Sequence, residues 1–420
     1  MLQVESRDVG PGPRFNARFV RVENQPDAQR LLTELGSDRG GVDRMSRKMQ
    51  LIVVSAENVQ ARAAHIIKQV MLSKGGECAT PRDVFLVDGK VSVRVIMMGT
   101  VTQFRRAIRN LSIQPFGLKA LASELARLLD DEFGSREPRI IEAGRHALDF
   151  GGRTLVMGVI NATPDSFSDP GELWKFEDAR ARAIEMAQAG VDILDIGGES
   201  TRPGAEPVTL DEELRRTVPL IESLAGEVSI PISIDSYKSA VTEKAIDAGA
   251  SIINDISGLR MDPAMISLAA ERSAPVVIMH MQGTPRDMQK DPQYEDVVSD
   301  ITRFLHKRCD TAIEGGVDPG KIMIDPGIGF GKTIEHNLEI IRRIEEFASL
   351  GYPVVMGTSR KRFIGAILDR PEDRRVLGTA ATVAFAIARG VDVVRVHDVE
   401  EMLEVVRMAD AVAGKSRTNE

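Results

Sequence analysis

Eight short runs of mainly apolar, often β-branched residues recur between residues 155 and 398, and longer stretches with helical periodicity separate them. Alternation of this kind predicts βα units around a parallel sheet. A doubly wound open sheet is the alternative, but no GxGxxG turn follows the first run, so the best-known use of that fold lacks support. Eight units instead predict an α/β fold, a closed (β/α)8 TIM barrel. The runs are LVMGVIN (155–161), ILDIGG (193–198), ISIDS (232–236), IINDIS (252–257), VVIMHM (276–281), IMIDPG (322–327), VVMGTS (354–359) and VVRVHD (393–398).

A segment that leads into the first run, ALDFGGRTLVMG (147–158), has the pattern of a β-hairpin. The dipeptide Gly151-Gly152 is typical of a tight hairpin turn. We therefore expect a hairpin that turns at these two glycines and closes the bottom of the barrel.

The first 140 residues follow a different pattern. Strands are expected at RFVRVEN (18–24) and MQLIVVSA (49–56), a helix at AENVQARAAHIIKQVMLS (56–73), a hairpin at DVFLVDGKVSVRVIMMG (83–99), and two further helices up to Phe133. The segment GSREP (134–138) has the composition of a linker. We predict a small N-terminal α+β domain over residues 1–140 and the barrel over residues 141–420.

The charge balance restricts the partners of this chain. A net charge of −8 and a pI near 5.5 argue against nucleic acid or an anionic membrane as a partner, so an anionic substrate needs a local basic site. Cys78 and Cys309 are the two cysteines, too few for a disulfide framework or a cysteine zinc site. The charged N-terminal segment and the lack of a long apolar run predict a cytoplasmic protein.

Polar residues stand at or just after almost every predicted strand. In a parallel barrel these strand ends meet at one mouth, where active sites lie. A single strand-end aspartate is often only a helix N-cap, but so many polar ends together predict a ligand site. They are Asn161, Glu199, Thr201, Arg202, Asp235, Asn254, Asp255, His280, Asp325, Lys361, Arg395 and His397.

Six motifs in the barrel resemble signatures of the dihydropteroate synthase family: NATPDSFSD (161–169), GGESTRPGA (197–205), MHMQGTP (279–285), IDPGIGFGK (324–332), GTSRKRFIG (357–365) and RVHDV (395–399). The resemblance runs in unbroken order from about residue 147 to the C-terminus. It implies a transferase of folate biosynthesis that joins 6-hydroxymethyl-7,8-dihydropterin pyrophosphate to 4-aminobenzoate, giving 7,8-dihydropteroate and pyrophosphate. It also implies a homodimer.

The resemblance implies that Asp235, Asn254, Met279, Asp325 and Lys361 bind the pterin. A carboxylate can accept two adjacent N–H donors from a pterin edge, and Asp325 is the candidate for that role. A lysine amine can approach the ring carbonyl and N5. His280 is expected to make only a structural hydrogen bond.

The remaining site residues are also taken from the resemblance. Arg395 and His397 would bind the pyrophosphate, with Asn161 as an oxygen ligand of Mg²⁺. The catalytic set would be Asp165, Lys361, Arg395 and His397. The aminobenzoate subsite would include residues from two loops and two later motifs: Phe167, Thr201, Arg202, Pro203, Gly329, Phe330 and Arg362. Arg362 departs from the family, where serine is common.

Two other functions fit parts of the pattern. A folate-dependent methyltransferase resembles this barrel in its ring-binding Asp and Asn, but it does not need TPDSFSD or STRPG. A non-catalytic pterin-binding scaffold is the second alternative, although the presence of Lys361, Arg395 and His397 weighs against it.

Overall fold

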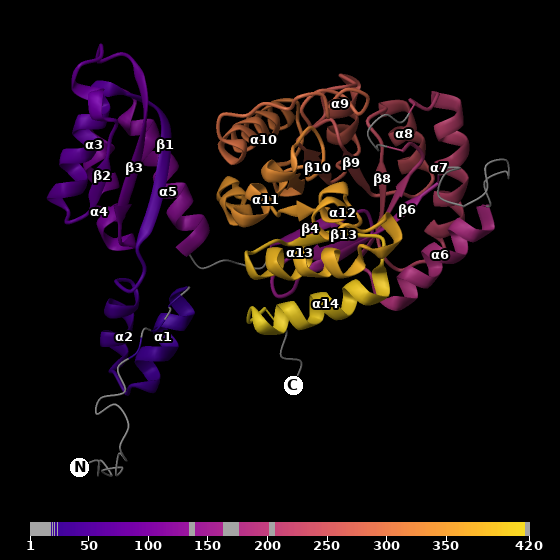
Figure 1. The fold of residues 1–420 in the computed structure, drawn as a ribbon, viewed down its shortest axis with the longest axis horizontal. Coiled ribbons are helices and arrows are strands. Elements are labelled where there is room, and N and C mark those ends of the chain that lie inside the picture. Colours follow the sequence, from indigo (N-terminus) through magenta and orange to yellow (C-terminus); the bar gives the residue numbers. More distant parts are fainter. Residues whose placement is uncertain are drawn as a thin grey trace, which may run out of the picture. The chain divides into compact units, whose positions relative to one another are not determined.

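The computed structural model describes residues 18, 20, 22, 24–133, 139–162, 176–200 and 206–415. The chain divides into two compact units, residues 1–136 and 137–420. Figure 1 shows both units and labels most of their helices and strands.

The first unit packs helices against a three-stranded antiparallel sheet of order β1-β3-β2. Its core joins Ile67 and Met71 of one helix to Met97 of the central strand and Phe104 of the next helix, all fully buried. This is the α+β composition expected. The elements are α1 (Gln25–Glu34), α2 (Arg39–Ser46), β1 (Ile52–Gln60), α3 (Ala61–Ser73), β2 (Glu77–Ala79), η1 (Arg82–Phe85), β3 (Ser92–Gly99), α4 (Val101–Leu111) and α5 (Leu118–Phe133).

Several boundaries predicted in this unit are wrong. Strand β1 runs on to Gln60, so α3 begins at Ala61 and not at residue 56. A bulge between Ala56 and Val59, with Asn58 at φ 55°, lets the strand continue its pairing with β3. Of the hairpin predicted at 83–99, the first arm is a 3-10 turn and a loop, and only the second arm is a strand. Those residues of 18–24 that the structure describes lie outside any strand.

The second unit is the predicted (β/α)8 barrel. Eight parallel strands follow the order β11-β10-β9-β8-β7-β6-β13-β12, and a parallel bridge between Ile324 and Val354 joins the two ends of this sheet. The strands are β6 (Leu155–Asn161), β7 (Ile193–Gly197), β8 (Ile232–Asp235), β9 (Ile252–Asp255), β10 (Val276–Met279), β11 (Ile322–Asp325), β12 (Val355–Met356) and β13 (Val393–Val396).

Helices surround these strands (Figure 1). A large apolar core lies between the strands and the helices, and a second, smaller one fills the barrel interior. The helices are α6 (Phe176–Ala189), α7 (Leu210–Ala225), α8 (Ser239–Asp247), α9 (Ala264–Glu271), α10 (Val297–Glu314), α11 (Ile334–Arg342), α12 (Arg362–Leu368), α13 (Val376–Ala388) and α14 (Val399–Val412), with short 3-10 turns η3 (Pro319–Lys321), η4 (Ile344–Leu350) and η5 (Glu372–Arg374).

A hairpin precedes the barrel, but its turn is not where the sequence predicted it. Strands β4 (Ile140–Ala143) and β5 (His146–Asp149) pair antiparallel around a turn at Gly144, which has φ 61°. Gly151 and Gly152 instead lie in the bend between β5 and β6. Buried Ile141 and Leu148 pack with the first residues of the barrel strands, so the hairpin does cover the amino-terminal end of the barrel, as expected.

No helix within the described part of the chain is both long enough and apolar enough to cross a membrane.

Candidate active site

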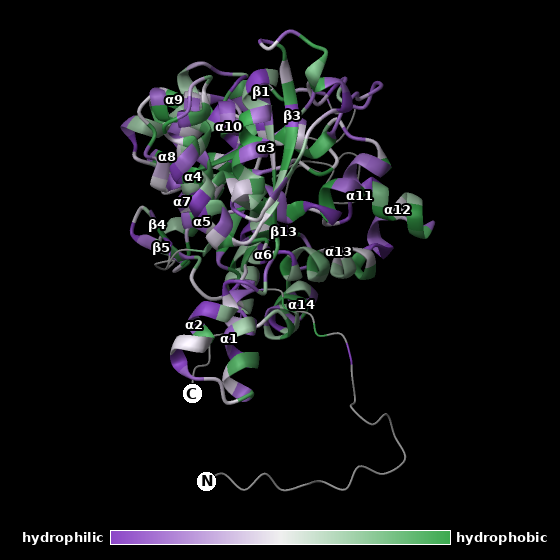
Figure 2. Cartoon of the chain, turned by 90° about the vertical axis from the view of Figure 1, so that its left-hand side faces the viewer, coloured by the Kyte–Doolittle hydropathy of each residue, from purple (hydrophilic) through white to green (hydrophobic). Residues whose placement is uncertain are grey.

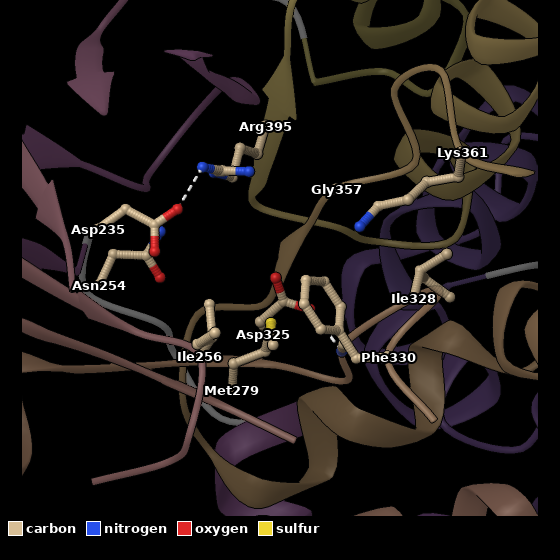
Figure 3. Close-up of a pocket in the computed structure, with 11 residues that line it drawn as sticks. Asp235, Asn254, Ile256, Met279, Asp325, Ile328, Phe330, Gly357, Lys361 and Arg395 are labelled. Atoms are coloured by element: carbon tan, nitrogen blue, oxygen red, sulfur yellow. Dashed lines mark hydrogen bonds and ion pairs between the residues drawn. The ribbon is translucent and has the colours of Figure 1, made fainter. Parts of the chain in front are cut away.

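A cavity lies at the carboxyl ends of the barrel strands. It brings together five of the predicted polar site residues, and Figure 3 shows the side chains of Asp235, Asn254, Asp325, Lys361 and Arg395 facing one space. Its apolar wall includes Met279 and Phe330, which were also predicted. The full lining is Asp235, Asn254, Ile256, Met279, Asp325, Gly327, Ile328, Phe330, Gly357, Lys361 and Arg395.

Arg395 of β13 lines this cavity and bonds to two carboxylates. Its Nε donates to Asp195 Oδ2 at 2.6 Å and its Nη2 donates to Asp235 Oδ2 at 2.7 Å. Burial raises the pKa of Asp235 to about 7, although Arg395 opposes that shift. For Arg395, burial disfavours the charged form, but the carboxylates of Asp195 and Asp235 outweigh it and raise the pKa. The guanidinium therefore stays charged.

Asp195 is a site residue that the sequence analysis missed. It lies in the middle of β7, fully buried, and its two oxygens also accept from Asn254 Nδ2 at 3.1 and 3.3 Å. It thus orients both Arg395 and Asn254 from below. One signal was present in the sequence, because a charged residue inside the apolar run ILDIGG needs a buried partner.

Lys361 enters the cavity from the segment that follows β12. Its Nζ lies 4.2 Å from the centre of the Phe330 ring, within range of a cation–π contact. Burial, and then the positive charge of Arg395, lower the pKa of Lys361 to about 8. Near neutral pH this amine is therefore a cation that loses its proton under mildly alkaline conditions.

Asp325 ends β11 and also lines the cavity. Its Oδ1 accepts from the Gly327 N–H at 2.6 Å. Burial raises the pKa of Asp325, while the Gly327 N–H and the cations Lys361 and Arg395 act in the opposite direction. Gly327 is at φ 69°, and a Cβ there would collide with the carbonyl oxygen of His280, so the turn requires glycine.

His397 and Asn161 lie next to each other, at the ends of the neighbouring strands β13 and β6. His397 Nε2 lies 3.4 Å from Asn161 Nδ2, and His397 Nδ1 lies 3.0 Å from Ser359 Oγ. Burial, followed by repulsion from Arg395, Arg360 and Lys361, lowers the pKa of His397 to about 3. The imidazole is therefore neutral and offers a single N–H rather than a positive charge.

The other predicted residues fall outside the cavity lining. Arg362 is exposed at the first position of α12. Gly329, at φ 85°, lies against the Lys361 side chain, since an added Cβ would approach Lys361 Cδ to 3.1 Å. The predicted residues on the first two loops lie outside the described residues: Asp165, Phe167, Thr201, Arg202 and Pro203.

Residues 157–397 match the sequence profile of the family described as pterin binding enzyme. The chain is also 47% identical over 283 residues to a dihydropteroate synthase of Synechocystis, covering 67% of this chain and 98% of that protein. The chain belongs to the dihydropteroate synthase family of pterin-binding enzymes. The strand-end residues from Asn161 to His397 all lie within the matched segment.

A solved dihydropteroate synthase shares the fold of the barrel. The enzyme of Xanthomonas albilineans, in its structure with 4-aminobenzoic acid, superposes with a TM-score of 0.62 at 41% identity, covering 66% of this chain and 98% of that chain. The superposition covers about two thirds of this dihydropteroate synthase family member, a share close to the length of its second unit, residues 137–420.

A longer relative extends the likeness into the first unit. A probable bifunctional folylpolyglutamate synthase/dihydropteroate synthase of Halobacterium salinarum is 42% identical over 393 residues. That alignment covers 93% of this chain but only 46% of the relative. Since residues 137–420 are only about two thirds of the chain, the alignment must include most of the first unit.

Proposed function

We propose that the barrel is a dihydropteroate synthase, which joins 6-hydroxymethyl-7,8-dihydropterin pyrophosphate to 4-aminobenzoate and releases pyrophosphate. The observation that carries this proposal is the cavity in which Asp235, Asn254, Asp325, Lys361 and Arg395 meet. Carboxylate, amide and cationic groups at its edges suit the mixed donors and acceptors of a pterin ring, and its apolar wall suits the ring faces.

The pterin is bound mainly by charged hydrogen bonds. Asp325 accepts from adjacent N–H groups of the ring, and each charge-assisted bond contributes about 1.5–3 kcal/mol. Lys361 donates to the ring carbonyl or N5. Met279 and Phe330 line the faces of the ring. We propose that the methylene carbon of the substrate points toward the barrel mouth.

The pyrophosphate is proposed to lie above Arg395 and His397, at the mouth. Among the described residues, no three His, Cys, Asp or Glu side chains are placed to hold a metal ion together. A site with Asn161 as its single protein ligand is compatible with Mg²⁺, because this ion keeps several waters and takes its other oxygen ligands from substrate phosphates. When bound, Mg²⁺ would neutralise part of the pyrophosphate charge. Arg395 supplies the fixed positive charge of the protein.

The reaction is a displacement at the methylene carbon. The C–O bond to pyrophosphate breaks with its electron pair, the aniline nitrogen forms the new C–N bond, and that nitrogen then loses a proton. Because an aniline is a poor nucleophile, we propose that the leaving group departs early and that positive charge spreads into the dihydropterin. Asp165 would stabilise this charge or order the metal site. Arg395 stabilises the negative charge that develops on pyrophosphate.

The aminobenzoate subsite is proposed to include Phe167, Thr201, Arg202 and Pro203 from the first two loops, with Phe330 and Gly329. Arg362 is exposed next to Lys361 in the chain and would pair with the aminobenzoate carboxylate. An Arg362→Ser variant tests this pairing, because it should raise the KM for aminobenzoate and leave pterin binding unchanged.

Pyrophosphate release by the full-length protein tests the proposed reaction. We expect release that requires dihydropterin pyrophosphate, 4-aminobenzoate and Mg²⁺, that stops with EDTA, and that falls at least about a hundredfold in Arg395→Ala, roughly 2.7 kcal/mol. Folded protein that binds pterin without releasing pyrophosphate would indicate a scaffold. Methyl transfer from a methylated folate would indicate a methyltransferase.

We further propose a homodimer that forms through α13. Leu377, Ala381, Phe385 and Ala388 are exposed along one face of this helix, and Figure 2 shows that its residues are mostly hydrophobic. A soluble helix seldom leaves such a face in water. Sedimentation velocity should show a dimer that Leu377→Glu with Phe385→Glu converts to monomer, while Leu35→Glu in the first unit leaves it intact.

We assign residues 1–140 to a separate domain and the synthase activity to residues 141–420. A truncation that tests this should begin at Glu137, because β4 starts at Ile140 and its hairpin fills the end of the barrel. Full activity of the truncated protein would support the assignment. A cytoplasmic location is also proposed, since Cys78 and Cys309 are both free and buried, as fits a reducing compartment.

A further inference from the structure

A buried lysine, Lys332, lies behind the pterin site without lining it. It ends the motif IDPGIGFGK, and it is 3% exposed. Burial of a lysine amine is costly unless it is hydrogen-bonded, so its partners should explain its presence. Burial lowers the pKa of Lys332 well below its ordinary value, while attraction to Asp325 opposes that shift.

The Lys332 amine joins two segments of the barrel. Its Nζ donates to the carbonyl oxygen of Phe330 at 2.9 Å and lies 2.9 Å from His280 Nδ1. The backbone N–H of His280 in turn donates to the carbonyl oxygen of Asp325 at 2.9 Å. These bonds connect the two ends of the loop 325–332. Lys332 at its end contacts the His280 side chain, and the His280 backbone bonds to Asp325 at its start.

The same loop carries two pterin-site side chains, Asp325 and Phe330, at its start and near its end. Neighbouring groups hold the rest of it: Gln289 donates to Gly329 O at 2.6 Å and Tyr294 donates to Gly331 O at 2.8 Å. Lys332 differs from Gln289 and Tyr294 because its amine also contacts His280. The backbone N–H of His280 donates to the Asp325 carbonyl oxygen.

We propose that Lys332 is a positioning residue for pterin recognition, which acts through His280 and the Phe330 carbonyl to fix Asp325 and Phe330 against the ring. The inference rests on the proposed function, because it assumes that the cavity binds pterin. Lys332 need not touch the substrate. In this arrangement His280 accepts from the Lys332 amine through Nδ1, and its backbone N–H donates to the Asp325 carbonyl oxygen.

The charged and titratable groups around the amine come from four elements. They are His280 after β10, Asp325 of β11, Lys361 after β12 and His336 of α11. Burial lowers the pKa of His280, and the nearby Lys332 amine and Arg260 guanidinium act in the same direction, so the imidazole is neutral and its Nδ1 can accept.

The test is the affinity of the full-length protein for 6-hydroxymethylpterin, measured by calorimetry on wild type and Lys332→Met. We expect at least about tenfold weaker binding in the variant. The matched control is Lys415→Met, which removes another mostly buried lysine whose Nζ donates to Val391 O at 3.0 Å, near the amino-terminal end of β13. It should bind within twofold of wild type.

A spectroscopic measurement separates positioning from a general loss of stability. The chain has six histidines, so ¹⁵N-histidine spectra are simple. In wild type, pterin binding should shift the His280 resonance, and Lys332→Met should shift it in the free protein. If Lys332→Met does not fold, Lys332→Gln is measured instead, and it should bind 6-hydroxymethylpterin at least about threefold more weakly than wild type. Wild type that binds no pterin overturns the proposed function, whereas equal binding by wild type and variant overturns this inference alone.

Discussion

Arg395 Nε lies 2.6 Å from Asp195 Oδ2, and this contact is made inside the barrel by a carboxylate that is fully buried. Asp195 does not line the cavity, yet it fixes the guanidinium that does. The position of the Arg395 guanidinium at the proposed pyrophosphate site therefore depends on Asp195. This residue lies on β7, which β6 separates from β13 in the sheet.

Replacement of Asp195 tests this dependence. Asp195→Asn leaves Arg395 with one carboxylate fewer, so we expect the free energy of unfolding to fall by about 3 kcal/mol and kcat/KM to fall at least tenfold. Urea unfolding and pyrophosphate release measure the two effects. Asp247→Asn is the control, because Asp247 pairs with Arg272 at the surface and such pairs contribute about 0–1 kcal/mol. Equal losses in the two variants would contradict the prediction.

The pH dependence should show a basic limb from Lys361. Its pKa of about 8 means that the amine is protonated below that pH, as the proposed bond to the pterin requires, and that it becomes neutral above it. We therefore expect kcat/KM to fall as the pH rises through about 8. In Lys361→Arg the guanidinium titrates only above about 12, so this limb should vanish even though activity is lower. A wild-type profile that stays flat up to about pH 9.5 would argue against this assignment.

A second ion pair holds the segments that carry Lys361 and His397. Arg360 Nε donates to Asp398 Oδ2 at 3.0 Å, and its Nη2 also contacts that carboxylate. Because each partner adjoins one site residue, Arg360→Lys should lower kcat/KM about three- to tenfold by losing the bidentate geometry. Arg389→Lys, which alters an exposed pair with Glu345, should have no such effect. A double-mutant cycle of Arg360→Met and Asp398→Asn that shows no coupling in kcat/KM would contradict this prediction.

Two glycines with positive φ should respond differently to alanine. Gly190 has φ 104° and nothing within 4 Å of an added Cβ, so Gly190→Ala should cost only about 1–3 kcal/mol of backbone strain. Gly327→Ala adds a collision with the His280 carbonyl and should cost more than about 3 kcal/mol or prevent folding. Thermal unfolding of both variants provides the comparison, and similar melting temperatures would disprove it.

The sequence alone predicted the barrel because its evidence is local and repeated. Each apolar run fits a buried parallel strand, and each helical stretch has its own periodicity, so all eight strands could be recognised without knowing their neighbours. Strand ends in such a barrel must converge, so Asp235, Asn254, Asp325, Lys361 and Arg395 could be included in a group of twelve polar strand-end residues. The resemblance to the family, and not this geometry, separated them from the others.

Only the tertiary structure decided features that depend on long-range pairing. Strand β1 continues past residue 56 because β3 pairs with it across a bulge, and the hairpin turns at Gly144 because β4 and β5 bury Ile141 and Leu148 against the barrel. The sequence signalled that Asp195 needs a buried partner, but the partners of Asp195 and Lys332 could not be identified from it, for the same reason. A buried charge is tolerated only where a partner lies within hydrogen-bond reach, and these partners, Arg395 and His280, lie 200 and 52 residues away along the chain.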